Sequence, residues 1–313
     1  MSDRIVTVTL NPAIDHTAGV PSFQLDAVNR VTWAQADAGG KGVNVASFLA
    51  EAGASVSVTG CLGAENLELF EQLFARKELQ DHFIRLPGKT RVNIKLVDEA
   101  QGQITDVNFP GLVVDRAGLQ QVQSVLQKLA LTHDWFVFAG SLPAGLPTTT
   151  YHDLIATLKS QNKAVVLDTS GEALRQALPT QPDLIKPNIA ELEALLGETL
   201  TNHAAIITAA RQLVGAGIQH VVVSMGADGA LFINEHQAIH AQAPAPEIKS
   251  TVGAGDAMIA GMVLGLSRGE TLADCATLAT AFSVGALGQI GPRLPDLAEI
   301  EALRCSVRLK HLT

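Results

Sequence analysis

Short apolar runs alternate along the chain with longer segments in which apolar residues recur every three or four positions. The short runs predict strands at 5–10, 56–61, 135–139, 164–167, 184–185 and 220–224. The longer segments predict helices at 41–53, 65–76, 115–131, 148–160, 171–178, 188–196 and 203–216. This alternation predicts a doubly wound α/β fold, in which helices cover both faces of a mostly parallel sheet.

The carboxyl-terminal part of the chain has a different pattern. A hairpin is expected around Leu231 to Ala241, and nearly all of 254–303 has helical periodicity. No repeat with a period of 20 to 50 residues interrupts the sequence. The pattern therefore predicts one large α/β unit that ends in helices.

One segment alternates polar and apolar residues with period two, as a strand outside the parallel sheet would. The polar members share one face, and they are Lys89, Arg91, Asn93 and Lys95. A turn containing Gly102 leads to 103–109, where Asp106 and Asn108 also share a face. We expect this hairpin to pair with the segment 15–33 in a small sheet over the carboxyl edge of the main sheet, where α/β ligand sites lie.

This arrangement divides the chain into two parts. The α/β domain is expected to comprise 1–10, 36–87 and 112–313, and the small sheet, which we call the lid, 11–35 and 88–111. The cations of the alternating segment, together with an Asn and no acid, favour an anion site on the lid. A face that is merely exposed to water is the alternative, because antiparallel sheets commonly alternate in this way.

Composition narrows the function. The 313 residues are 47% hydrophobic and 17% charged, which indicates a globular protein with a large core. The formal charge of −9 opposes binding to nucleic acid or to anionic membranes, so we expect neither as a partner. Any phosphate site must therefore be built from local cations and backbone donors.

Cysteines and the amino terminus bear on location. Cys61, Cys275 and Cys305 are scattered and form no Cys-x-x-Cys, which argues against a disulfide framework and against a cysteine metal site. The chain starts without a recognisable leader, and its longest strongly apolar run, 257–266, is about half the roughly 20 residues of a membrane span. We expect a cytoplasmic protein.

The clearest chemical motif is Ser-Thr-Val-Gly-Ala-Gly-Asp at 250–256, directly before a long apolar helix. The backbone N–H groups of Gly253, Ala254 and Gly255 would be free at the helix amino terminus and form an anion site. Asp256 would stand beside a bound phosphoryl group, and this positive environment would lower its pKa, leaving it ionised and a weak base. In the alternative interpretation, Asp256 only complements the helix dipole.

Two further motifs lie at the starts of expected helices. Ala-Gly-Gly-Lys-Gly-Val-Asn-Val-Ala at 38–46 is neither a Walker A loop nor a dinucleotide fingerprint, and it could be purely structural. Lys-Pro-Asn-Ile-Ala-Glu at 186–191 ends a strand and has the spacing of a capping box, with Asn188 as N-cap and Glu191 at the third helical position. Asn188 and Glu191 could instead hold a water-coordinated Mg²⁺.

Two more stretches complete the set, Asn-Pro-Ala-Ile-Asp at 11–15 and Ser-Met-Gly-Ala-Asp-Gly at 224–229. In this order the motifs resemble the ribokinase-like carbohydrate kinases of the phosphofructokinase-B type, in particular the branch that acts on hexose phosphates. The resemblance spans nearly the whole chain. It implies a doubly wound α/β domain with a β-sheet lid, a homodimer formed through the lid, and MgATP-dependent phosphorylation of a sugar hydroxyl.

The resemblance also assigns roles by position. It implies Asp256 as the catalytic base, and Gly253, Ala254 and Gly255 as the anion hole. The implied ligands of the sugar phosphate are Asp15, Gly39, Gly40, Lys41, Asn44, Arg91, Asn93, Lys95 and Asn108. The implied ATP ligands are Lys186, Asn188, Ser224, Gly226, Gly229 and Thr251, with Asn188 and Glu191 organising Mg²⁺. A monovalent cation is a further candidate cofactor.

For the substrate, the stretches Arg-Val-Asn-Ile-Lys at 91–95 and Thr-Asp-Val-Asn at 105–108 most resemble the members of this family that act on fructose 1-phosphate. This resemblance implies phosphorylation of fructose 1-phosphate at its 6-hydroxyl, giving fructose 1,6-bisphosphate and ADP. Tagatose 6-phosphate and fructose 6-phosphate are the alternatives, because a ketohexose furanose carries its two arms on opposite sides of the ring oxygen. A catalytically silent sugar-phosphate sensor on the same fold is a hypothesis of a different class.

Overall fold

A computed structural model describes residues 4–244 and 247–312. Residues 1–3, 245–246 and 313, which include both outer limits of the expected α/β domain and the start of the chain, lie outside the described residues. Among the residues that are described, no helix is both long and apolar enough to cross a membrane.

The main sheet contains the strands that the sequence predicts for the α/β domain. Its order is β15-β14-β13-β12-β11-β10-β9-β1-β4-β5, with β6 paired to β4, and the strands from β12 to β5 are parallel. The strands are β1 (Arg4–Thr9), β4 (Ser55–Gly63), β5 (Gln80–Asp81), β6 (Ile84–Leu86), β9 (Trp135–Ala139), β10 (Ala164–Asp168), β11 (Leu184–Ile185), β12 (His220–Ser224), β13 (Ala230–Ile233), β14 (Ala238–Gln242) and β15 (Arg308–Leu312). The mostly parallel α/β fold is confirmed, whereas β5, β6 and β15 were not predicted.

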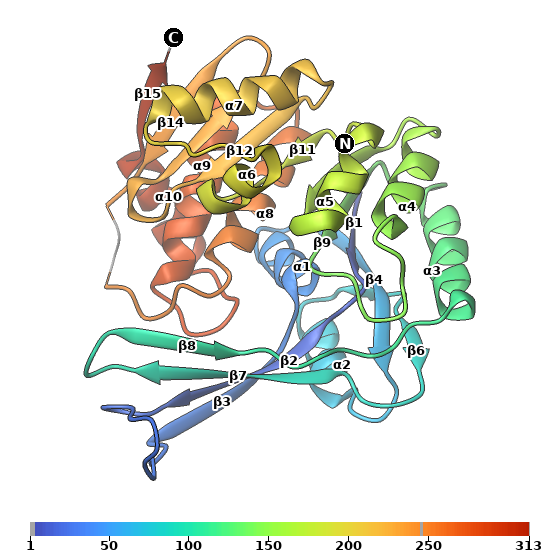
Figure 1. Cartoon of the computed structure of the whole chain (residues 1–313), viewed down its shortest axis with the longest axis vertical. Coiled ribbons are helices and arrows are strands. Elements are labelled where there is room, and N and C mark those ends of the chain that lie inside the picture. Colours follow the sequence, from blue (N-terminus) through green and yellow to red (C-terminus); the bar gives the residue numbers. More distant parts are fainter. Residues whose placement is uncertain (1–3, 245–246, 313) are drawn as a thin grey trace.

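Helices cover both faces of this sheet (Figure 1). Successive side chains of a strand point to opposite faces, so in β1 Ile5 packs into one core and Val6 and Val8 into the other. The first core includes α1 (Lys41–Glu51), α2 (Glu68–Arg76), α8 (Ala254–Ser267), α9 (Leu272–Leu287) and α10 (Leu297–Ser306). The second includes α3 (Arg116–Leu129), α4 (Thr150–Lys159), α5 (Gly171–Ala177), α6 (Ile189–Leu196) and α7 (His203–Gly215).

The small sheet predicted from the alternating segment is also present, below the main sheet in Figure 1. It consists of β2 (Ala13–Gly19), β3 (Trp33–Gly39), β7 (Arg91–Asp98) and β8 (Gln103–Val107), in the order β3-β2-β7-β8. β2 and β7 pair in parallel, and the two outer pairs are antiparallel. Since β3 continues to Gly39 and leads directly into α1, the limits of the lid remain a prediction.

The passage from β3 to α1 requires glycine. A Cβ on Gly39 would lie 2.6 Å from Oδ2 of Asp15 on the neighbouring strand. Gly40, the N-cap of α1, has a φ of 108°, which L side chains rarely adopt. The lid and the first helix can therefore follow one another with a single residue between them.

Candidate active site

Two helices begin at the same place in the fold. Gly40 is the N-cap of α1, and Gly253, with a left-handed backbone at φ 82°, is the N-cap of α8. The two helices are joined near their starts, where Nδ2 of Asn44 donates a hydrogen bond to Oδ2 of Asp256 over 2.8 Å. Each start presents unpaired backbone N–H groups and the positive end of a helix dipole, so we expect the pair to favour an anion.

Charged side chains from the carboxyl ends of two strands complete this site. Asp168 ends β10, and its Oδ2 lies 3.0 Å from Nζ of Lys41. Lys186 follows β11, and its Nζ lies 3.8 Å from Oδ1 of Asp168. A Cβ added to Gly255 would lie 3.2 Å from the same Nζ, so Lys186 borders the start of α8. The structure thus brings Lys41, Lys186 and Asp256 together around Asp168.

Asp168 was not predicted as a site residue from the sequence. It carries the same signal as Lys186, a charged residue at the carboxyl end of a buried strand, but no motif drew attention to it. Its side chain is only 1% exposed, which for a carboxylate indicates a specific partner.

The expectation for the acidity of Asp256 was wrong in direction. Burial raises the pKa of Asp256 to about 6, and the nearby charge of Asp168 adds to this, while Lys41, Asn44 and Lys186 act against it. The sequence showed the helix start but not how completely α1 and the strand ends enclose the carboxyl group. Asp256 is therefore a stronger base than expected, and it is ionised at neutral pH because 7 lies above its pKa.

The charge of Lys41 is secured by its neighbours. Burial would lower the pKa of Lys41, but Asp168 and Asp256 outweigh burial and raise the pKa above its ordinary value. The ammonium group is therefore fully protonated near neutral pH. Its contacts place it beside Asp256, and its expected role as a sugar ligand stays a prediction.

The polar face of the lid contains acids as well as cations. Nδ2 of Asn93 donates to Oδ1 of Asp15 over 3.2 Å, and Nζ of Lys95 lies 2.9 Å from Oδ1 of Asp106. Burial raises the pKa of Asp15, although Lys95, Asn93 and Arg91 oppose the shift. The expectation of a polar face without acids is correct only for the residues of β7, because β2 and β8 add carboxylates to the same face of the sheet.

Hydrogen bonds to backbone carbonyl groups fix the position of the Arg91 side chain. Its guanidinium donates to the carbonyl oxygens of Asn11, Pro12 and Phe109 at 3.0, 3.3 and 3.2 Å. Burial lowers the pKa of Arg91, against the influence of Asp15. A guanidinium carries five N–H donors, so these three bonds leave two for a ligand. Asn108, just beyond β8, is exposed.

The capping box predicted at 188–191 is confirmed. Oδ1 of Asn188 accepts from the backbone N–H of Glu191 over 2.8 Å, and Oε2 of Glu191 accepts from the N–H of Asn188 over 2.9 Å. A cavity beside these two residues extends to Ser170 and Gly171 at the start of α5 and to Arg175 in its last turn. The other residues that are expected to bind ATP lie on or beside the same edge of the sheet, and they are Ser224, Gly226, Gly229 and Thr251.

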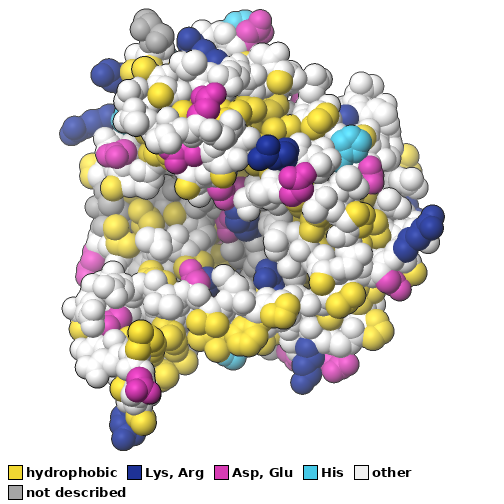
Figure 2. Space-filling view, in the orientation of Figure 1, with side chains coloured by type: hydrophobic (Ala, Val, Ile, Leu, Met, Phe, Trp, Pro, Cys, Tyr) yellow, Lys and Arg dark blue, Asp and Glu magenta, His cyan; other side chains and the backbone are white. Residues whose placement is uncertain are grey.

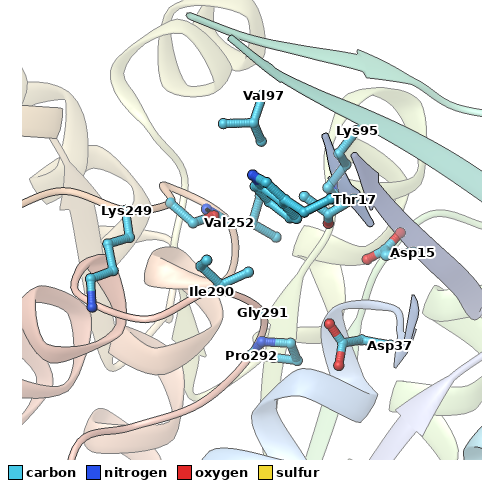
Figure 3. Close-up of a pocket in the computed structure, with 12 residues that line it drawn as sticks. Asp15, Thr17, Asp37, Lys95, Val97, Lys249, Val252, Ile290, Gly291 and Pro292 are labelled. Carbon is cyan, nitrogen blue, oxygen red and sulfur yellow. Dashed lines mark hydrogen bonds between the residues drawn. The ribbon is translucent and has the colours of Figure 1, made fainter. Parts of the chain in front are cut away.

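A cavity separates the lid from the main domain. Figure 3 shows Asp15 and Lys95 on the lid side, facing Val252 and Ile290 across it. Figure 2 shows the hollow between the two parts, with acidic and basic side chains inside. The floor of the hollow is the edge of the sheet where the strands end, which is the usual ligand crevice of an open α/β sheet.

Comparison with known proteins agrees with this site. The model of the pfkB family carbohydrate kinases matches residues 7–298. The chain therefore belongs to the pfkB family of carbohydrate kinases, which confirms the resemblance seen in its motifs.

Several members of this family are similar to the chain over almost its full length. The chain is 51% identical over 313 residues to the 1-phosphofructokinase of Rhodobacter capsulatus, covering 100% of this chain and 99% of that protein. It is 42% identical over 312 residues to the 1-phosphofructokinase of Vibrio cholerae, covering 100% and 98%. Among solved structures, phosphofructokinase-2 from Escherichia coli in complex with substrates and products matches with a TM-score of 0.91 at 30% identity, over 96% of this chain and 98% of that one. The same enzyme has been solved in complex with potassium, with a TM-score of 0.89.

Proposed function

We propose that this protein transfers the γ-phosphoryl group of ATP to the 6-hydroxyl of fructose 1-phosphate, giving fructose 1,6-bisphosphate and ADP. Full-length relatives at 51% and 42% identity carry the name 1-phosphofructokinase, which supports this substrate. The observation that carries the reaction type is the meeting of two helix starts and Lys186 around the buried carboxylate of Asp256.

The site supplies a base and a place for the transferred group. Asp256 accepts the proton of the 6-hydroxyl, the oxygen forms a bond to the γ-phosphorus, and the bond from that phosphorus to the β–γ bridging oxygen breaks. The electron pair of the broken bond leaves with ADP. The N–H groups of Gly253, Ala254 and Gly255 stabilise the charge on the moving phosphoryl group, and such preorganised donors supply most of the catalysis in phosphoryl transfer.

The lid would hold the sugar. Asp15 and Asn93, already hydrogen-bonded to each other, present oxygen and nitrogen atoms that suit sugar hydroxyl groups. Arg91 has two donors left for the phosphate at the far end of the substrate, with Lys95 beside it on the same strand face. Closing the lid over the cavity of Figure 3 would exclude water from the γ-phosphoryl group.

A divalent cation is implied for a carbohydrate kinase that uses ATP. Mg²⁺ is usually held by phosphate oxygens, waters and one or two carboxylates. This fits the chain, because the described residues contain no cluster of three or more metal-ligating side chains, whereas Glu191 and Asn188 offer a carboxylate and an amide beside a cavity. These two residues would hold the ion's waters, and the ion would neutralise charge on the β- and γ-phosphates.

Three further features complete the proposal. A monovalent cation is a candidate cofactor, since phosphofructokinase-2 from Escherichia coli has been solved in complex with potassium. The chain would form a homodimer through its lid, where Leu25 and Val28 are 86% and 87% exposed. A cytoplasmic location suits an enzyme that uses ATP and has three cysteines, all of them free.

The test is a coupled assay of ADP release with fructose 1-phosphate, fructose 6-phosphate and tagatose 6-phosphate. We expect the highest kcat/KM with fructose 1-phosphate. A higher value with either of the other two would keep the reaction and change the substrate. Equal ADP release by the wild type and by Asp256→Asn would exclude Asp256 as the base. Binding of a sugar phosphate without any ADP release would favour the sensor.

A further inference from the structure

The part of the site that no motif predicted is the pairing of Asp168 with two lysines. Lys41 and Lys186 come from different elements, the start of α1 and the segment after β11, and both reach the carboxyl group at the end of β10. One buried carboxylate thus sits between two cations, within a chain of net charge −9. Asp256, which is ionised at neutral pH, balances the second ammonium group, so the side chains of the cluster are close to neutral. The backbone N–H groups at the starts of α1 and α8 add partial positive charge there, which favours an anionic ligand.

The two partners of the closer pair differ in how accessible they are. The side chain of Asp168 is 1% exposed, whereas that of Lys41 is 40% exposed. An arriving phosphate would therefore meet the ammonium group and not the carboxylate behind it. An ammonium has three N–H donors, so a bond to Asp168 leaves two for a ligand.

We propose that Asp168 is a positioning residue that holds the ammonium group of Lys41 beside Asp256, and that Lys41 binds the phosphoryl group during its transfer. This inference rests on the proposed kinase function and adds a catalytic residue to it. Lys41 then acts on the phosphoryl group in transfer, whereas the family resemblance implied that it binds the sugar phosphate.

Position supports this assignment. Lys41 is the first residue of α1, and Asn44, one turn later on the same helix, donates to Asp256. The first turn of α1 thus places Asn44 in contact with Asp256 and Lys41 in contact with Asp168. Without Asp168, the long and flexible lysine side chain would lose the partner that fixes its direction.

The charges around Asp256 make the proposal measurable. The groups that face it are Lys41 from α1, Asp168 from β10 and Lys186 from the segment after β11. α9 also packs on α8, but its charged residue, Asp274, lies beside Cys275, which contacts Gly265 at the opposite end of α8. Asp168 raises the pKa of Asp256 and Lys41 lowers it. Removing the charge of Asp168 should therefore lower the pKa of Asp256, and removing the charge of Lys41 should raise it.

The experiment compares Asp168→Asn and Lys41→Met with the wild type in pH profiles of kcat and kcat/KM. We expect kcat to fall about a hundredfold or more in Lys41→Met and about tenfold or more in Asp168→Asn. The acid limb of kcat/KM, near pH 6 in the wild type, should move to lower pH in Asp168→Asn and to higher pH in Lys41→Met. The kcat values separate the two roles, because an ion pair that only stabilises the fold would move the limb through the same two charges but leave kcat unchanged.

Asp183→Asn is the matched control. Asp183 is also a buried carboxylate paired to a lysine, Lys159 at 2.8 Å, but it precedes β11 at the other edge of the sheet. This variant should lose stability and keep the wild-type acid limb. If Asp168→Asn behaves in the same way, with kcat and acid limb unchanged, the positioning role is overturned.

Two outcomes remain to be separated. If Asp168→Asn does not fold, Lys41→Met carries the test alone, and an unchanged kcat and acid limb in that variant overturn the proposal. If the wild type prefers another sugar phosphate, the substrate proposal fails, but the same profiles recorded with the preferred sugar still test Lys41 and Asp168.

Discussion

Burial, more than sequence neighbours, decides what Asp256 can do. The helix dipole and two lysines favour its charged form, yet enclosure between α1 and the strand ends raises its pKa to about 6. The raised pKa makes Asp256 a better proton acceptor while leaving it ionised at pH 7. Its activity should therefore be present above about pH 6 and be lost as the pH falls through that value.

Replacing Asp256 by Asn should remove most of kcat and leave the fold intact, because the amide keeps the shape of the side chain but cannot accept the proton. We expect a loss of about 10² to 10⁴ in kcat. Steady-state kinetics beside a thermal melt measure both effects. Turnover near that of the wild type would exclude Asp256 as the base.

The Arg91→Ala variant tests how the lid recognises phosphate. Loss of a charge-assisted hydrogen bond should raise KM for fructose 1-phosphate about tenfold or more and change KM for ATP little. Arg85→Ala is the control, since Arg85 pairs with Asp81 on a different sheet edge. Equal weakening of both substrates would show that Arg91 serves the lid through its carbonyl contacts and does not read the phosphate.

Some residues of the candidate site could be predicted from the sequence, and others could not. The glycines and Asp256 belong to a contiguous motif, and the structure places them at one helix start. Asp168 is separated from Lys41 and Lys186 in the sequence and became visible only when neighbouring strands brought the three together. The pKa of Asp256 was misjudged for the same reason, because burial depends on distant elements.

At the scale of elements, the start of α6 has one observed role and one proposed role. Its capping box satisfies backbone donors, and the same carboxylate is proposed to hold waters of Mg²⁺. Glu191→Gln should keep the cap, because Gln can also accept from the N-cap N–H, but should raise the Mg²⁺ concentration needed for activity.

A magnesium titration of the reaction rate measures this effect. Glu299→Gln is the control, because Glu299 occupies the equivalent third position of α10, where its N–H donates to Asp296 over 2.9 Å. An unchanged magnesium requirement in Glu191→Gln would leave Glu191 with its capping role alone.

The packing of α8 on α9 depends on Gly261. A Cβ at this position would lie 2.6 Å from Cα of Ala279 on the facing helix, so Gly261→Ala should destabilise the fold by about 1–3 kcal/mol. Urea unfolding measures the loss. Gly215→Ala at the end of α7 is the control, since an added Cβ there meets no atom within 4 Å. Equal stability of the two variants would contradict close packing at Gly261.

Elements were predicted well where they are buried and poorly at the edges. β10 and β12 are continuous apolar runs, as strands covered on both faces must be. β15 reads Arg-Leu-Lys-His-Leu and, among the strands that the structure describes, pairs with β14 alone. An edge strand can be short and charged because its backbone bonds come from its neighbour, so hydrophobic patterning gives little sign of it.

For the whole molecule, the net charge of −9 opposes the binding of polyanions, so we expect phosphate binding to depend on the few cations that the fold gathers. The exposed apolar residues of the loop between β2 and β3 are the opposite case. Leu25, Val28 and Val31 are 86%, 87% and 56% exposed, and water contact for all three is unfavourable in a monomer.

Val28→Asp should therefore shift the proposed homodimer towards monomer, because a charge placed in an apolar contact must be desolvated without a partner. Sedimentation velocity measures the distribution of species. Leu131→Asp is the control, since Leu131 is 82% exposed at the end of α3, outside the lid. A wild-type chain that is monomeric at every concentration would contradict the lid-mediated dimer.

The pairing of β2 with β7 has a consequence for how the chain folds. Asp15 and Asn93 lie opposite each other in this pair but are 78 residues apart, and α1, β4 and α2 come between them. Closing so long a loop is entropically costly until the intervening elements have condensed, so the lid sheet should form last. A chain arrested during synthesis or refolding would then have a folded α/β domain before its lid could enclose a sugar. In that state the anion site would be exposed to water.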